Sequence, residues 1–316
     1  MTVRILTGDC RERLAELPAQ SVHCCVTSPP YFGLRDYCHE GQMGLEPTPD
    51  EFVSGMVRVF RDVRRVLRDD GTLWLNIGDS YTGGGAGRND GNHRADGRPG
   101  GMSYKATGVT HNRGLCGLKT KDLIGIPWML AFALRADGWY LRQDIIWSKP
   151  NPMPESVRDR CTKAHEYVFL LSKSPRYYFD AEAIAEMAVA AEHHLRYAEA
   201  AKGYAKKQPF QKQSGMMGVS DNGTRNKRSV WEVATQPYSE AHFATYPPAL
   251  IEPCILAGCP KGGTVIDPFF GAGTTGLVAD RLQRDCIGIE LNPEYAELAR
   301  KRIADESGMF GEVLAA

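Results

Sequence analysis

The chain has 316 residues, of which 42% are hydrophobic and 24% charged, and its 38 basic and 38 acidic side chains give a formal net charge of zero. One α/β domain with insertions can reach this length and bury a large core, and no run approaches the roughly 18 apolar residues of a membrane span, so a soluble protein is expected. Residues 1–6 lead into a strand-like segment without signal-peptide architecture, which predicts a cytoplasmic location.

The first part of the chain alternates strand and helix patterns. Short apolar runs predict strands, and apolar residues at helical spacing predict helices. In chain order these elements are a strand at 3–7, a helix at 10–17, a strand at 22–27, a helix at 49–67 and a strand at 72–77. The second strand delivers Ser28-Pro29-Pro30-Tyr31 at its carboxyl end, where open parallel sheets place their ligand sites.

Positive charge gathers in two stretches. Residues 81–121 hold seven Lys or Arg against two Asp, with 11 glycines, and residues 202–228 hold seven against one Asp. Neither builds a core of its own, so the first is either a surface loop or an arm that orders on DNA. Gathered positive charge suits phosphate contacts. The candidate DNA-binding residues are Arg88, Arg94, Arg98, Lys105, Arg113, Lys206, Lys207, Lys212, Arg225, Lys227 and Arg228.

The middle of the chain contains a helix at 126–137 and strands at 139–147 and 166–172, with a proline-stiffened loop from residue 148 to residue 154 between the strands. The two strands are expected to pair as an antiparallel edge hairpin. Residues 181–240 are the least regular part and are predicted to form a target-recognition region, with a flexible surface insertion as the alternative.

The C-terminal part carries a strand, a glycine turn and a helix in succession, after a helix at 247–256. Val265 and Ile266 suit a buried strand, and Gly271-Ala272-Gly273 lets the backbone turn tightly against a ligand before Thr274 opens a helix. The next strand ends in Glu290, an acid that can hold a ribose. Asn292-Pro293 starts another helix.

The glycines permit two interpretations. Gly271, Gly273 and Gly276 match the spacing G-x-G-x-x-G followed by an acidic residue, so a nicotinamide- or flavin-dependent oxidoreductase is one candidate class. However, Asp267-Pro268-Phe269 directly before them, together with Ser28-Pro29-Pro30-Tyr31, resembles the DNA amino-methyltransferases, which use S-adenosylmethionine. A non-enzymatic DNA-binding module would explain the basic stretches but not two motifs at strand ends.

The order of the two motifs resembles the β class of that family, in which the order is circularly permuted. The resemblance implies an α/β fold: a seven-stranded, mostly parallel, Rossmann-like methyltransferase sheet with helices on both faces and one antiparallel strand, here with small basic insertions. It divides the chain into a catalytic half at 1–180, which includes the basic loop 81–121, the target-recognition region at 181–240 and a cofactor-binding half at 241–316.

The resemblance also implies which residues bind S-adenosylmethionine. The methionine end would lie on the D-P-F-x-G-x-G segment, Glu290 would accept from the ribose, Asp9 and Cys10 would border the adenine, and residues 243–247 resemble the remaining cofactor motif. The cofactor-binding residues so implied are Asp9, Cys10, Phe243, Thr245, Asp267, Phe269, Gly271, Gly273, Thr274, Thr275, Glu290 and Asn292.

The S-P-P-Y segment supplies the candidate catalytic residues Ser28, Pro29, Pro30 and Tyr31. An exocyclic amine of cytosine or adenine is a poor nucleophile because its lone pair is delocalised into the ring. Ser28 Oγ and the Pro29 carbonyl can accept its two hydrogens and favour a pyramidal nitrogen, while Tyr31 can stack on a base flipped out of the duplex.

The nine cysteines include no C-x-x-C pair, no zinc-spaced Cys/His cluster and no nucleophile with a positioned base. No metal site is predicted, and attack on ring carbon C5 of cytosine is disfavoured. In the family, serine at the first motif position is associated more often with cytosine N4, and aspartate or asparagine with adenine N6. The implied reaction is site-specific methylation of cytosine N4 in double-stranded DNA, with adenine N6 as the close alternative.

The resemblance also implies a role in DNA methylation as part of a restriction–modification system. The resemblance leaves open whether the protein forms a homodimer and whether a cognate restriction endonuclease accompanies it.

Overall fold

The computed structural model describes residues 1–34, 39–82, 118–188, 223–236, 245–306 and 312–315. Several predicted site residues lie outside these ranges. They are Phe243 of the cofactor set and Arg88, Arg94, Arg98, Lys105, Arg113, Lys206, Lys207 and Lys212 of the DNA-binding set.

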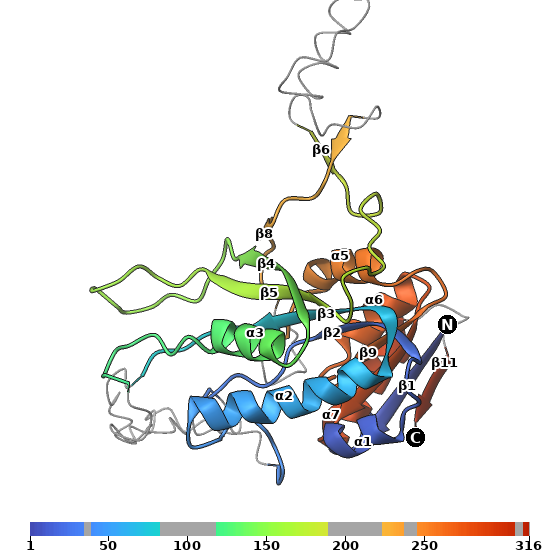
Figure 1. The fold of residues 1–316 in the computed structure, drawn as a ribbon, viewed down its shortest axis with the longest axis horizontal. Helices are drawn as coiled ribbons and strands as arrows, with labels where there is room; N and C mark the ends of the chain where they lie inside the picture. The colour runs from blue at the N-terminus through green and yellow to red at the C-terminus, as the bar shows by residue number, and fades with distance from the viewer. Residues whose placement is uncertain (35–38, 83–117, 189–222, 237–244, 307–311, 316) are drawn as a thin grey trace, which may run out of the picture.

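Across the described ranges the main sheet has nine strands in the order β11-β1-β10-β9-β2-β3-β5-β4-β8 (Figure 1). Their bounds are β1 Thr2–Thr7, β2 Val22–Thr27, β3 Leu67–Ile77, β4 Tyr140–Ser148, β5 His165–Ser172, β8 Val230–Glu232, β9 Thr264–Asp267, β10 Asp285–Glu290 and β11 Glu312–Ala315. Neighbours pair in parallel except at β5, which runs antiparallel to β3 and β4. The mostly parallel sheet and the antiparallel hairpin are confirmed.

The predicted strand count of seven needs correction. The seven expected strands form the centre of the sheet, and the short strands β11 and β8 extend it beyond β1 and β4. Segments of three or four residues hold too few periods of an apolar pattern to be recognised from sequence.

Helices cover both faces of the sheet. On one face α1 (Cys10–Glu16), α2 (Pro49–Val66) and α3 (Ile126–Ala136) pack into a core with side chains of the sheet such as Leu73. On the other face α5 (Pro248–Gly258), α6 (Thr274–Arg281) and α7 (Pro293–Glu306) pack into a second core. Figure 1 shows α2 and α3 in front of the sheet, and the two cores together confirm the predicted helices on both faces.

The start of α2 follows its sequence signals. Thr48 Oγ1 accepts a 3.2 Å hydrogen bond from the Glu51 amide, and Pro49 occupies the first helical position, where its missing N–H costs nothing. The end differs from the prediction, which left residues 68–71 between a helix and a strand, because β3 begins directly at Leu67. Backbone bonds from Tyr178 N to Asp70 O, 2.9 Å, and from Lys173 N to Gly71 O, 3.2 Å, hold that first part of β3.

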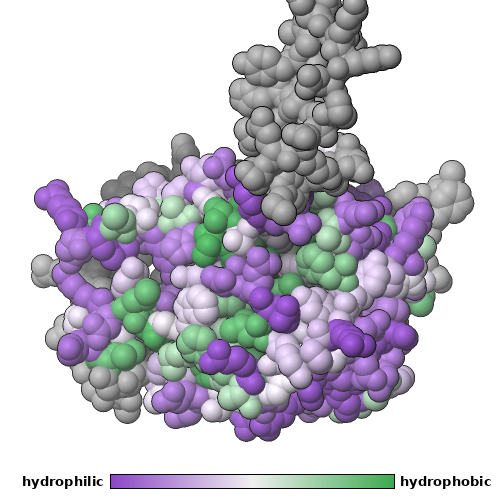
Figure 2. Space-filling view, turned by 45° about the horizontal axis from the view of Figure 1, so that its top comes forward, coloured by the Kyte–Doolittle hydropathy of each residue, from purple (hydrophilic) through white to green (hydrophobic). Residues whose placement is uncertain are grey.

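A second, two-stranded sheet joins β6 (Glu186–Met187) to β7 (Thr224–Arg225), and Figure 1 shows β6 standing away from the main sheet. On the face drawn in Figure 2, hydrophobic residues form small patches among hydrophilic ones. No helix among the described residues is long and apolar enough to cross a membrane.

The sheet direction decides where ligands can bind. Six strands, β1, β10, β9, β2, β3 and β4, run the same way and bring their carboxyl ends to one edge. The reversed strand β5 presents its amino end, His165 and Glu166, at that edge. Both sequence motifs therefore meet there.

Candidate active site

A cavity of about 870 Å³ lies at the carboxyl edge of the sheet, and it is within the range of roughly 300–1,000 Å³ typical of ligand pockets. Its wall combines the loops after β1, β2, β9 and β10 with the ends of the β4–β5 hairpin. The predicted residues that line it are Asp9, Cys10, Ser28, Pro29, Pro30, Tyr31, Thr245, Phe269, Gly271, Thr274, Glu290 and Asn292. Residues from both ends of the chain thus share one cavity.

The glycine turn forms part of the cavity wall. Gly271 and Gly273 have φ angles of 52° and 76°, a left-handed conformation that glycine adopts without strain. A Cβ atom added to Gly273 would lie 2.9 Å from the Ala299 Cβ atom, so α7 also requires glycine here. The Phe270 amide donates to Ile289 O at 2.9 Å and fixes the turn against β10.

Glu290 is held by the backbone of two loops. Its Oε2 accepts from the Gly271 amide at 2.7 Å, and its Oε1 accepts from the Asn292 amide at 2.9 Å. Burial raises the pKa of this carboxyl group above its ordinary value. Since each carboxylate oxygen can accept two bonds, both oxygens keep an acceptor position for a vicinal diol such as a ribose. This chemistry fits a nucleoside cofactor.

Asp267 lies beneath the cavity wall and is 1% exposed. Thr27 Oγ1 and the Phe269 amide donate to its Oδ1 at 2.6 and 3.0 Å, and Thr275 Oγ1 and the Tyr246 hydroxyl donate to its Oδ2 at 2.6 and 2.9 Å. Burial raises the pKa of Asp267. The four bonds use the acceptor positions of a carboxylate, so the geometry favours a positioning role over direct contact with a ligand.

Two further predicted cofactor residues, Gly273 and Thr275, also lie outside the cavity lining. Gly273 shapes the turn, and Thr275 joins the buried cluster around Asp267. Thr274, which does line the cavity, accepts a 3.0 Å bond from Arg302 at its Oγ1.

Asp9 and Cys10 line the cavity from the start of α1, directly after β1. Asp9 caps α1 through the Arg11 amide at 2.8 Å, and its side-chain bond with the Arg11 guanidinium lowers the pKa of the carboxyl group. Burial raises the pKa of the Cys10 thiol to about 12, so the thiol stays neutral at physiological pH. This residue forms part of the wall and is no nucleophile.

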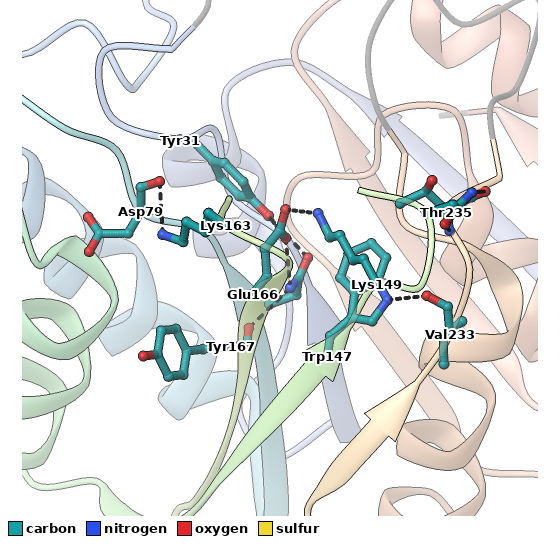
Figure 3. Close-up of polar contacts among 11 residues, drawn as sticks. Tyr31, Asp79, Trp147, Lys149, Lys163, Glu166, Tyr167, Val233 and Thr235 are labelled. Carbon is teal, nitrogen blue, oxygen red and sulfur yellow. Dashed lines mark hydrogen bonds and ion pairs between the residues drawn. The ribbon is translucent and has the colours of Figure 1, made fainter. Parts of the chain in front are cut away.

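The S-P-P-Y loop is rigid around a fixed tyrosine. The Tyr31 hydroxyl bonds to Glu166 Oε2 at 2.5 Å and to Asn76 Oδ1 at 3.3 Å, as Figure 3 shows for Glu166. A Cβ atom on Gly78 would lie 2.6 Å from Tyr31 Cε2, so the ring rests on a glycine. Ser28 makes no side-chain hydrogen bond within the described ranges, which leaves its hydroxyl open to a ligand.

An ion pair that the sequence reasoning missed faces the tyrosine. Lys149 Nζ pairs with Glu166 Oε1, and the two side chains are only 17% and 16% exposed (Figure 3). The Lys149 ammonium also lies 4.3 Å from the centroid of the Trp147 ring, whose Nε1 donates to Val233 O at 2.7 Å. The predicted β4–β5 hairpin could have indicated this ion pair. Its register places Trp147 opposite Glu166 at the edge of the sheet where ligands bind, and Lys149 follows two residues later.

A second lysine of this wall, Lys163, donates to Asp79 O at 3.1 Å, and burial lowers its pKa. The Asp79 carboxylate accepts from the Gly125 and Ile126 amides at 3.0 and 3.2 Å and so fixes the start of α3. Among the described residues, no group of three or more His, Cys, Asp or Glu side chains could hold a metal ion.

Three of the candidate DNA-binding residues are described. Arg225 and Arg228 both bond to Glu186, at 3.0 and 2.5 Å, but their side chains differ in exposure, 28% against 68%. Lys227 Nζ lies 5.3 Å from the centroid of the Trp231 ring. Arg225 is thus built into the β6–β7 sheet, whereas Arg228 faces solvent.

The fold and the cavity together define an α/β protein with a site suited to a nucleoside cofactor beside an S-P-P-Y loop. A family model described as DNA methylase, for N6 and N4 methyltransferases, matches residues 22–301. The chain belongs to this N6/N4 DNA methylase family, and it is an S-adenosylmethionine-dependent DNA methyltransferase.

Relatives match nearly the whole chain. The type II methyltransferase M.SmaI of Serratia marcescens is 49% identical over 300 residues, covering 95% of this chain and 90% of its own. The type II methyltransferase M.Cfr9I of Citrobacter freundii is 47% identical over 302 residues, covering 96% and 88%.

Solved structures share the fold. The PvuII DNA methyltransferase (cytosine-N4-specific) superposes with a TM-score of 0.62 at 18% identity, covering 96% of this chain and 92% of its own. A DNA modification methylase of Thermus thermophilus, TTHA0409, complexed with S-adenosyl-L-methionine, superposes with a TM-score of 0.58 at 24% identity, covering 99% of both chains. The circularly permuted α/β fold expected from the motif order is therefore confirmed.

Proposed function

We propose that this protein is a site-specific DNA methyltransferase that methylates the exocyclic N4 amine of a flipped-out cytosine in double-stranded DNA. The observation that carries the proposal is one cavity lined by both Ser28 and Glu290. Their strands, β2 and β10, lie on either side of β9, so the amine-binding loop and the nucleoside-binding loop face each other across the glycine turn.

The cofactor half of the cavity would hold S-adenosylmethionine, which supplies a methyl group on a sulfonium when bound. We assign the ribose to Glu290, the adenine border to Asp9 and Cys10, and the turn around the methionine end to Phe269 and Gly271. Asp267 would position these residues from beneath the cavity wall. Its carboxylate accepts hydrogen bonds from Thr27, Thr275, Tyr246 and the Phe269 amide.

The base half of the cavity would act on the amine through positioned acceptors. Ser28 Oγ and the Pro29 carbonyl accept the two amine hydrogens and turn the nitrogen lone pair out of conjugation. Tyr31, fixed by Glu166 and Gly78, presents its ring as a stacking surface for the base. No strong base is needed before attack, because the nitrogen becomes acidic only after methylation.

Two features favour cytosine over adenine. Ser28 occupies the motif position at which serine is more often associated with cytosine N4. Lys149 adds an N–H donor to the same wall, and a cytosine presents a carbonyl oxygen on its pairing edge where adenine has a C–H group. Adenine N6 is the alternative product.

DNA would be bound by the two basic stretches and the target-recognition region, much of which lies outside the described residues. We assign the catalytic half to residues 1–180, target recognition to residues 181–240 and the cofactor-binding half to residues 241–316, with the basic loop 81–121 as an arm along the DNA. The relatives named as type II methyltransferases support a modification enzyme of a restriction–modification system. A nicotinamide-dependent oxidoreductase has no support from the family match.

The test is mass spectrometry of nucleosides from DNA incubated with the purified protein and S-adenosylmethionine. The proposal predicts N4-methylcytosine. N6-methyladenine would overturn the assignment of the base while keeping the fold, the cofactor and base flipping. No methylated nucleoside on several DNA substrates would contradict the proposed function as a whole.

A further inference from the structure

The loop between β4 and β5 carries an apolar side chain that the proposed chemistry does not use. Met153 lines the cavity, yet it is 84% exposed, the highest value among the exposed large hydrophobic residues of the described ranges. A side chain that both lines a cavity and reaches into solvent stands at its mouth. An apolar side chain in this position can contact what enters the cavity.

The backbone of this loop is held in place on both sides of Met153. Prolines at 150, 152 and 154 restrict the backbone on both sides of Met153. Asn151 Nδ2 donates to Thr235 O at 3.2 Å, and Asn151 Oδ1 accepts from the Thr235 amide at 2.9 Å. The Lys149 amide closes the base of the loop by donating to Ala164 O at 2.8 Å. The backbone is therefore fixed, and the flexible thioether side chain projects from it.

The surroundings of Met153 suit a nucleic acid. Residues 149–164 contain four basic and two acidic side chains. Arg158 is exposed, and the Arg160 guanidinium bonds to Glu155 at 2.6 Å and lies 4.0 Å from the centroid of the Tyr81 ring. Arg158 thus carries an exposed positive charge on the same loop as the apolar tip, and it can contact a phosphate while the tip meets the bases.

Base flipping creates a need that this side chain can meet. A nucleotide that leaves the duplex exposes the faces of its neighbours, and apolar side chains inserted between base steps cover such faces in other DNA-binding proteins. We propose that Met153 is the wedge that enters the DNA stack in place of the target base. The inference rests on the proposed function, because it requires a flipped base. Methionine suits the task because it is unbranched and polarizable.

The test compares duplexes that differ only in how firmly the target base is held. The substrate is a duplex that carries a site found methylated by the purified protein, and a second duplex has an abasic position opposite the target base. The variants are Met153→Ala, Met153→Leu and, as a control, Leu314→Ala, which removes another exposed apolar side chain from the far edge strand β11.

A wedge is needed most where the target base is paired. We expect Met153→Ala to lower kcat/KM about 10- to 100-fold on the paired duplex and less than about 3-fold on the abasic duplex. The kcat/KM values of Met153→Leu and Leu314→Ala should stay close to those of the unsubstituted protein on both duplexes. The Kd of S-adenosylmethionine should not change in any of the variants. Unchanged activity of Met153→Ala on the paired duplex, or an equal loss on both duplexes, would overturn the proposal. Absence of any methylated site would instead count against the proposed function.

Discussion

Thr27 Oγ1 donates a 2.6 Å hydrogen bond to Asp267 Oδ1, which joins two residues 240 positions apart in the chain. Thr27 directly precedes Ser28 at the end of β2, and Asp267 ends β9 just before the glycine turn. The bond therefore fixes the amine-binding loop relative to the cofactor-binding loop. Since methyl transfer requires its reacting atoms to be aligned at close range, this contact bears on both stability and rate.

Replacing Asp267 with alanine should destabilise the fold strongly. The substitution removes the acceptor for three hydroxyl groups and one amide, and each buried donor left unpaired costs about 1–3 kcal/mol. We expect a loss of at least about 3 kcal/mol in the free energy of unfolding, measured by urea denaturation. The control is Asp305→Ala, which replaces an exposed aspartate in the last turn of α7. It should change the free energy of unfolding by no more than about 0.5 kcal/mol. Equal effects of the two substitutions would contradict the role assigned to Asp267.

Affinity for S-adenosylmethionine should fall on acidification because of Glu290. Burial raises the pKa of this group, so it takes up a proton at a higher pH than an ordinary glutamate, whose pKa is about 4.3. Since the ionised form accepts from a ribose, the Kd should rise as the pH falls toward that raised pKa. Isothermal titration calorimetry from about pH 8 to about pH 5 measures the effect.

Glu290→Gln provides the matched control for this pH dependence. Glutamine keeps one oxygen acceptor but does not titrate, so the variant should bind more weakly at neutral pH and keep only the pH dependence that comes from the cofactor and the other groups of the cavity. The difference between the two pH profiles then reports Glu290 alone. Identical slopes in both proteins would show that Glu290 does not contact the cofactor.

The sequence predicted the outline of this site because its two motifs follow strands. Ser28 and Glu290 each come directly after an apolar run, and the carboxyl ends of parallel strands meet at one edge. The pairing of Lys149 with Glu166 depends on the register of the β4–β5 hairpin, which no local pattern specifies. The hydrogen bonding of Asp267 likewise depends on side chains from three separate segments, those of Thr27, Tyr246 and Thr275, that converge on it.

Ser28→Ala should separate chemistry from cofactor binding. The substitution removes one of two acceptors for the amine hydrogens, and loss of one such positioned group typically lowers kcat about 10²- to 10³-fold. The Kd of S-adenosylmethionine should stay nearly unchanged, because the residues assigned to the cofactor lie on other strands. Methylation kinetics and calorimetry on the same preparation give both values.

The control for Ser28→Ala is Ser21→Ala, in which the lost hydroxyl bonds only to Pro18 O at the other end of β2. It should keep full activity. Normal turnover by Ser28→Ala would overturn the assigned role of the S-P-P-Y serine, whichever base is methylated.

Arg225 and Arg228 offer a matched pair for locating DNA on the surface. Both bond to Glu186, but Arg228 is 68% exposed and can reach a phosphate, whereas Arg225 is 28% exposed and holds the β6–β7 sheet. Arg228→Gln should therefore reduce the slope of log K against log salt by about 0.9, the value of one phosphate contact. Arg225→Gln should leave that slope unchanged.

Fluorescence anisotropy of a labelled duplex, titrated at several salt concentrations, measures both slopes. A change in slope reports a lost phosphate contact, while a uniform loss of affinity at every salt concentration reports a distorted surface. An unchanged slope in Arg228→Gln would remove this arginine from the DNA interface. An equal drop in both variants would show that the ion pairs to Glu186 open when DNA binds, because Arg225 can reach a phosphate only after it leaves that carboxylate.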